Sequence, residues 1–62
     1  MMEPGDRIVV RTPDRRAYFG WLVEVREAPG NTQAVVRLDT GWLTAYPLHM
    51  VHAAGESPEP RA

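Results

Sequence analysis

The chain has 62 residues, a net charge of −1 at pH 7 and no cysteine. It is therefore one small domain without disulfides or thiolate metal sites, and it is too close to neutral for a general nucleic-acid binder, which needs a clearly basic face. No apolar run reaches the ~18 residues of a membrane helix, and the acidic start is unlike a signal peptide, so we expect a cytoplasmic protein with no membrane partner.

Two strands are predicted in the first half of the chain. Arg7–Arg11 is the first β-prone run, and residues 12–15 form a turn after it, with proline preset for the first central position. The second strand, residues 17–27, is the longest run of aromatic and β-branched residues, so we expect the other strands to pair with it. Gly20, near its start, indicates a bulge or a close backbone approach.

A loop and a hairpin are predicted in the second half. Pro29–Gly30 fits a type II turn, because glycine tolerates the positive φ that the second central position requires. Gln33–Leu38 is the third strand, and its apolar residues alternate. Residues 39–41 close a tight hairpin into the fourth strand, residues 42–46.

The remaining residues complete an all-β domain. Residues 47–49 suit one turn of 3₁₀ helix and residues 50–53 a short fifth strand, whereas residues 55–62, with two prolines and two glutamates, predict a disordered tail. This order of five strands with one 3₁₀ turn before the last is typical of an SH3-like barrel, here over residues 1–54. Closing the sheet on itself would bury one core, for which we expect Ile8, Val10, Leu22, Val25, Val36, Leu38, Leu43 and Val51.

Three segments carry a family resemblance: residues 5–10, 20–26 and 35–41. In this order they resemble the patterns Gly-Asp-Arg-Leu-Val-Val, Gly-x-Ile-Val-Glu-Val-Arg and Val-Arg-Phe-Asp-Asp-Gly of a family of small actinobacterial SH3-like barrel proteins of unknown function. The resemblance implies the fold and no activity. The chain departs from the family at Trp21, where the family is polar, at Trp42, which replaces Gly-His, and at residues 46–50, which replace Pro-Gly-Pro-Asp-Ala.

Two looser resemblances point to other SH3-like barrels. Residues 43–47 are similar to a strand end of the type II dihydrofolate reductases, but Thr44 and Ala45 stand where that family has the glutamine and isoleucine of its active-site pore. A reductase of this type is therefore a remote alternative. The first two strands also resemble the KOW motif of ribosomal and transcription proteins.

Few residues could carry catalysis. Asp39-Thr40-Gly41 is the aspartic-protease triplet, but that chemistry needs two aspartates sharing a proton, so we interpret it as a hairpin turn with glycine in the left-handed position. His49 and His52 have no cysteine or close carboxylate to complete a metal site, and Ser57 has no base near it. We therefore expect a binding module rather than an enzyme, without cofactor or metal.

An arginine-bearing loop is the first candidate binding site. Arg15 and Arg16 lie at its tip, Arg11 is nearby, and Tyr18 follows as an aromatic side chain for stacking. Arginine side chains contact phosphate, so this set suggests nucleic acid as the partner. The alternative is a solvated loop beside Asp14.

Exposed aromatic residues are the second candidate. Strict alternation of residues 42–46 predicts Trp42, Thr44 and Tyr46 outward and the two residues between them, Leu43 and Ala45, inward. Trp42 and Tyr46, together with Trp21, would then form an interaction face for a protein partner or for a second copy in a homo-oligomer. The alternative is that these aromatics cover an open edge of the barrel. The sequence leaves the choice between nucleic acid and protein open.

Overall fold

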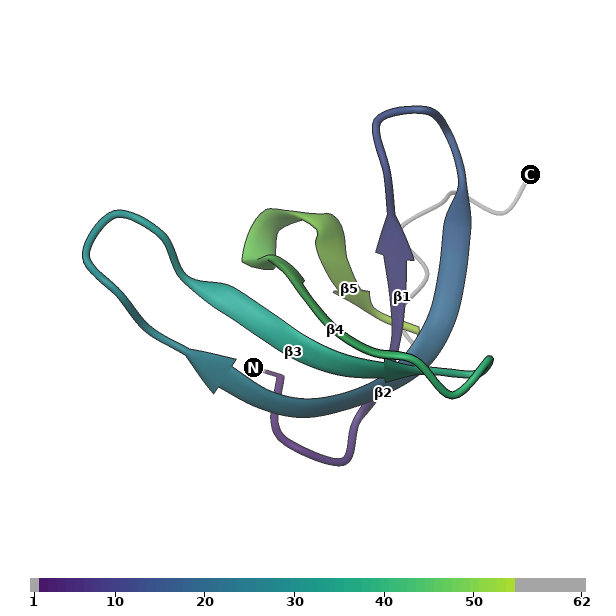
Figure 1. The fold of residues 1–62 in the computed structure, drawn as a ribbon, viewed down its shortest axis with the longest axis horizontal. Helices are drawn as coiled ribbons and strands as arrows, with labels where there is room; N and C mark the ends of the chain where they lie inside the picture. Colours follow the sequence, from purple (N-terminus) through teal and green to yellow (C-terminus); the bar gives the residue numbers. More distant parts are fainter. Residues whose placement is uncertain (1, 55–62) are drawn as a thin grey trace.

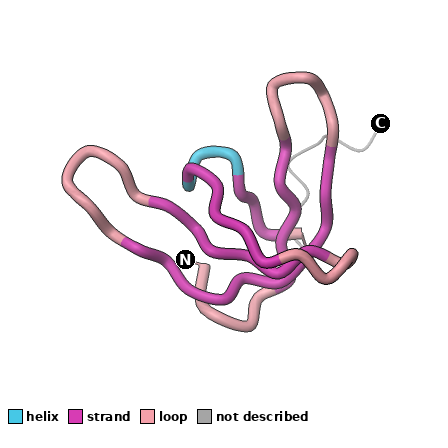
Figure 2. Tube along the Cα trace, viewed as in Figure 1, coloured by secondary structure: helices cyan, strands magenta, loops and turns pink. Residues whose placement is uncertain are grey.

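The computed structural model describes residues 2–54, which form a single antiparallel sheet (Figure 1). Its elements are β1 (Arg7–Arg11), β2 (Ala17–Arg26), β3 (Gln33–Leu38), β4 (Leu43–Pro47), the 3₁₀ turn η1 (Leu48–Met50) and β5 (Val51–Ala53). Figure 2 shows η1 as the one helical segment of this part of the chain, directly before the last strand. The predicted all-β class, five strands and 3₁₀ turn are confirmed, whereas the predicted tail lies outside the described residues.

The strand order is β4-β3-β2-β1-β5, so β2 is central, as its length predicts. Residues 17–21 of β2 pair with β1, and residues 20–26 pair with β3. Within the described residues β4 and β5 do not pair with each other, so the hydrogen-bonded closure expected of a barrel is not seen. The sheet is instead strongly curved, with η1 joining its two edge strands (Figure 1).

The curvature of β2 has a local cause. The pairing register between β2 and β3 shifts between Leu22 and Glu24, which makes Val23 the extra residue of a β-bulge and bends the strand. The backbone of Leu22 is also held by the segment before β1, because its N–H donates to the Asp6 carbonyl at 2.9 Å and its carbonyl accepts from Gly5 N–H at 2.8 Å. The bend lets one strand serve both halves of the sheet.

Gly20 marks a close approach of two backbones, which is one of the two roles predicted for it. A Cβ atom at this position would lie 2.4 Å from the Arg37 carbonyl oxygen and 2.9 Å from the Leu38 Cα. The bulge lies further along the strand. Only a residue without a side chain therefore lets β2 and β3 pack at this distance.

The core lies on the concave face of the sheet. It consists of Ile8, Val10, Leu22, Ala34, Val36 and Val51, with Val25, Leu38, Tyr18 and Tyr46 among the half-buried residues packed against them. Seven of the eight predicted core residues are buried or half-buried here. The prediction for Leu43 is wrong, because its side chain is 53% exposed.

The side chains of β4 face the opposite way from the prediction. Thr44 pairs with Val36, and Tyr46 pairs with Ala34, so both side chains share the face of the buried residues opposite them. The register is set by the hairpin turn, in which Leu38 N–H donates to the Trp42 carbonyl at 2.8 Å. Leu43 therefore lies on the outer face, although it is more apolar than Thr44.

Candidate functional site

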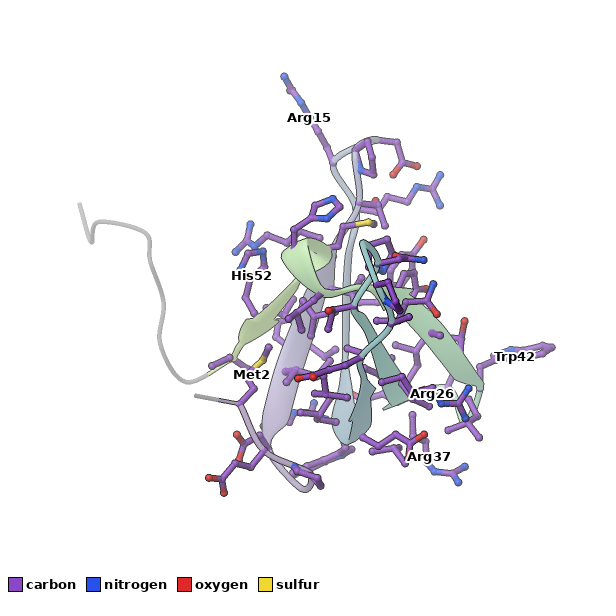
Figure 3. All side chains as sticks on the ribbon, turned by 90° about the vertical axis from the view of Figure 1, so that its left-hand side faces the viewer. Met2, Arg15, Arg26, Arg37, Trp42 and His52 are labelled. Atoms are coloured by element: carbon purple, nitrogen blue, oxygen red, sulfur yellow. The ribbon has the colours of Figure 1, made fainter. Side chains whose placement is uncertain are left out.

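The convex face of the sheet carries four large, exposed apolar side chains, which we call the outer patch: Phe19, Trp21 and Val23 of β2 and Leu43 of β4. They share one face of the sheet, on which Arg37 of β3 lies between Trp21 and Leu43 in the strand register. Trp42 lies directly before β4 at the hairpin end of this face. It is 71% exposed, and Figure 3 shows its side chain pointing away from the sheet.

An arginine covers part of the outer patch. The guanidinium carbon of Arg7 lies 4.8 Å from the ring centroid of Trp21 and 5.8 Å from that of Phe19. The same guanidinium donates to both carboxylate oxygens of Asp39, at 2.7 and 2.8 Å. Asp39 is held in place by its own N–H, which donates to the Phe19 carbonyl at 2.9 Å. Arg7 is therefore fixed by two rings and a bidentate ion pair.

The hydrogen bonds from Arg7 hold the pKa of Asp39 below its ordinary value, and the same bonds raise the pKa of Arg7. The two shifts agree in direction, as expected for an ion pair. The ion pair therefore stabilises the folded protein at pH values above the ordinary pKa of Asp39. This stabilisation is lost as pH falls through the lower pKa that Asp39 has in the folded protein. For Arg7, whose pKa is raised, the contribution is lost at the alkaline end, as pH rises through the higher folded value.

We therefore expect the Asp39 carboxyl to titrate below 3.8, its ordinary pKa, because Arg7 stabilises the ionised form. Carboxyl carbon shifts measured by NMR from about pH 6 to about pH 2 give this value directly. In an Arg7→Gln variant the titration should return to the ordinary value. An identical midpoint in both proteins would contradict the ion pair.

The outer face also carries cations without a partner. The ion pairs among residues 2–54 are Arg7–Asp39, Arg16–Asp14 and Arg26–Glu24. Arg37 lies between Trp21 and Leu43 in the strand register. It takes part in none of these ion pairs. Arg11 lies on the same sheet face at the end of β1. The acidic side chains of this face, Asp39 and Glu24, are both paired with arginine. The unpaired arginines therefore give the face a positive charge.

The predicted arginine loop does not bring its four residues together. Arg15 lies at the tip of the β1–β2 loop (Figure 3) and takes a left-handed φ of 68°, at the position that Gly41 occupies in the β3–β4 turn. Arg16 is paired with Asp14 at 3.3 Å. Tyr18 pairs with buried Val10 and packs against the core, so it lies on the face opposite Arg11. The loop offers arginines without a stacking partner.

The predicted interaction face is also divided. Trp21 lies on the outer face, Trp42 at its hairpin end, and Tyr46 on the core face. The sequence reasoning missed Phe19, Val23 and Arg7. The spacing of Phe19, Trp21 and Val23 at every second residue is the signal that could have found this surface, because such residues share one strand face.

Metal ligands, membrane spans and similar proteins are the remaining observations that bear on function. Residues 2–54 contain no group of three metal-ligating side chains. No helix within the same residues has the length and apolarity needed to span a membrane. Comparison of the chain with protein-family models, with curated proteins and with solved structures gave no match.

Proposed function

We propose that this protein is a binding module whose outer patch docks a protein segment that presents a carboxylate between apolar side chains. The observation that supports the proposal is the distribution of exposed apolar side chains. The five large ones among residues 2–54 are the outer patch and Trp42, and they all lie on one sheet face or at its hairpin end. Large exposed apolar side chains gathered on one face in this way are typical of an interaction site.

The apolar residues supply the affinity in this proposal. Complete burial of an aromatic side chain removes about 150–250 Å² from water, and each Å² contributes about 25 cal/mol. Covering the exposed parts of Phe19, Trp21 and Trp42 then stabilises a complex by roughly 5–10 kcal/mol before the cost of association. Phe19 and Trp21 are presented from a paired strand, so little backbone order is lost when they are covered.

Charge selects the partner. Arg37 stands between Trp21 and Leu43 without an ion pair in the described chain, and a partner carboxylate would satisfy it while apolar neighbours cover the two flanking side chains. A partner with a lysine at that position would be repelled. The segment that fits best therefore alternates acidic and apolar residues.

Nucleic acid fits this face less well than protein. Base stacking uses the faces of aromatic rings, and Arg7 already lies over the rings of Trp21 and Phe19. A base that stacks on Trp21 or Phe19 from this side would have to displace Arg7 and break its bidentate contact with Asp39. A protein segment can instead cover the ring edges, Val23 and Leu43 while this ion pair stays intact.

The test is an amide-resolved NMR titration with two synthetic peptides, one alternating leucine with glutamate and one alternating leucine with lysine. We expect saturable shifts at the outer patch and Arg37 with the first peptide and much weaker shifts with the second. Trp21→Ala should weaken binding by about 30-fold or more, as for a central aromatic residue of an interface. Arg37→Glu should abolish it, whereas Arg15→Glu, a matched charge reversal in the β1–β2 loop, should leave it unchanged.

Three outcomes would contradict the proposal. Equal binding of both peptides at the outer patch would remove the role of Arg37. Shifts with mixed-sequence single-stranded DNA at Arg11, Arg15 and Arg16 that vanish with salt would favour the nucleic-acid hypothesis instead. Line broadening of the outer patch that grows with protein concentration, without peptide, would identify a second copy as the occupant.

A further inference from the structure

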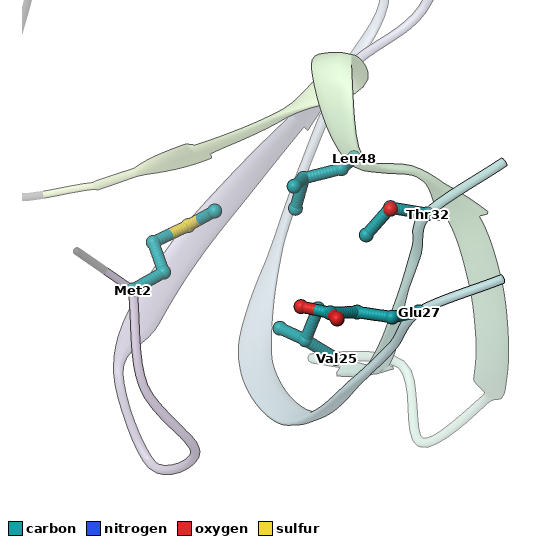
Figure 4. A pocket seen from close by; sticks show the side chains of 5 residues that line it. All are labelled: Met2, Val25, Glu27, Thr32 and Leu48. Atoms are coloured by element: carbon teal, nitrogen blue, oxygen red, sulfur yellow. The ribbon is translucent and has the colours of Figure 1, made fainter. Parts of the chain in front are cut away.

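A hollow on the other side of the molecule forms a second candidate site. It has a volume of about 380 Å³ and is lined by Met2, Val25, Glu27, Thr32 and Leu48. These residues come from three segments: the start of the chain, the β2–β3 hairpin and η1. Figure 4 shows their side chains pointing toward one shared space, with the carboxylate of Glu27 extending into it beside Val25.

The lining combines an apolar surface with one charged group. Met2, Val25 and Leu48 supply aliphatic and thioether surface, and all three pack against the edge of the core. Thr32 supplies a hydroxyl group. The carboxylate of Glu27 takes part in none of the ion pairs or side-chain hydrogen bonds of residues 2–54. The other acidic residues between β1 and residue 54 are paired with arginine.

We propose that this hollow binds an aliphatic primary ammonium group, with the methylene chain on the apolar lining and the ammonium at the Glu27 carboxylate. The Thr32 hydroxyl is the second acceptor, because an ammonium group has three donors to satisfy. A methylene chain of four or five carbons suits the lining, since such stems bury along apolar surface while the charged end stays with its partner. The lysine side chain and free alkylamines share this chemistry.

The lining disfavours other ligand classes. Quaternary ammonium ligands are recognised by aromatic rings, and the hollow is lined by none. Anions would be repelled by Glu27. Neutral apolar molecules would leave the carboxylate without a partner, so they gain only the hydrophobic part of the binding energy. This site lies on the concave side of the sheet, so it is independent of the outer patch.

The test is an NMR titration of the intact protein with n-pentylammonium, and with pentanol and pentanoate as controls of matched chain length. We expect saturable shifts in the millimolar range at Val25, Glu27, Thr32 and Leu48 with the ammonium only. Glu27→Gln should weaken binding about tenfold, as for the loss of one charge-assisted contact. Glu24→Gln, the same change on the outer face, should have no effect.

Further arms separate the source of the ammonium and the ways the proposal fails. N-acetyl-lysine amide should bind at the same residues if a lysine side chain is the ligand, and should not bind if only free alkylamines enter. Pentanol binding as tightly as pentylammonium, shifts outside the lining, or unchanged affinity in Glu27→Gln would each overturn the proposal. None of these results depends on the outer patch, so the two proposals are tested independently.

Discussion

Replacement of Gly20 by alanine is expected to destabilise the domain by about 3 kcal/mol, which approaches the whole stability of a domain of this size. The added Cβ would lie 2.4 Å from the carbonyl oxygen of Arg37 and 2.9 Å from the Cα of Leu38. Both neighbours belong to the backbone of β3, so no side chain can move aside to relieve the overlap. Urea unfolding followed by circular dichroism measures the effect.

Gly41→Ala is the matched control. A Cβ at Gly41 would meet no atom within 4 Å, but the residue has a φ of +102°, which alanine adopts only with strain. The expected loss is about 1 kcal/mol, the cost of the left-handed conformation alone. If Gly20→Ala were no more destabilising than Gly41→Ala, the close approach of β2 and β3 would be wrong.

Leu22→Ala is the second substitution with a large expected effect. The Leu22 side chain is 2% exposed and lies in the core cluster beside the bulge of β2. Its truncation removes buried methyl groups and leaves a cavity, for which we expect a loss of about 3 kcal/mol in the free energy of unfolding. Thermal and urea unfolding would show transition midpoints far below those of the parent protein.

Leu43→Ala makes the same chemical change on the outer face. Because Leu43 is 53% exposed, its truncation should change stability by less than about 0.5 kcal/mol. A loss for this variant as large as that for Leu22→Ala would show that the orientation of β4 is the one that strict alternation predicted. The pair therefore tests the corrected register as well as the core.

The strands and turns could be predicted because their signals are local. Proline and glycine mark the loops, and β2 is a long, uninterrupted β-prone run. The face of β4 could not be predicted from its composition, because Leu43 is a better core residue than Thr44. The hairpin turn decides the register, and a shift of one residue moves every side chain of a strand to the other face.

Three of the four residues of the outer patch lie on β2 and have a sequence signal, whereas the contacts of Arg7 are assembled across strands. Arg7 meets Trp21 through the pairing of β1 with β2, and it meets Asp39 at a separation of 32 residues. No spacing in the sequence indicates that contact. The hollow at Glu27 depends on three distant segments and leaves no sequence signal either, since its apolar residues are unremarkable in their own elements.

Within residues 2–54, β4 and β5 each pair with one strand only, and this has a consequence for assembly. β4 and β5 differ, so a contact between β4 of one molecule and β5 of another would be heterologous and would leave a free edge at each end. Such a contact repeats from molecule to molecule, and it produces a ring where the rotation closes and a filament where it does not. Pro47, which lacks an N–H at the end of β4, and the three-residue length of β5 both limit this pairing. These short edges therefore disfavour edge-to-edge association.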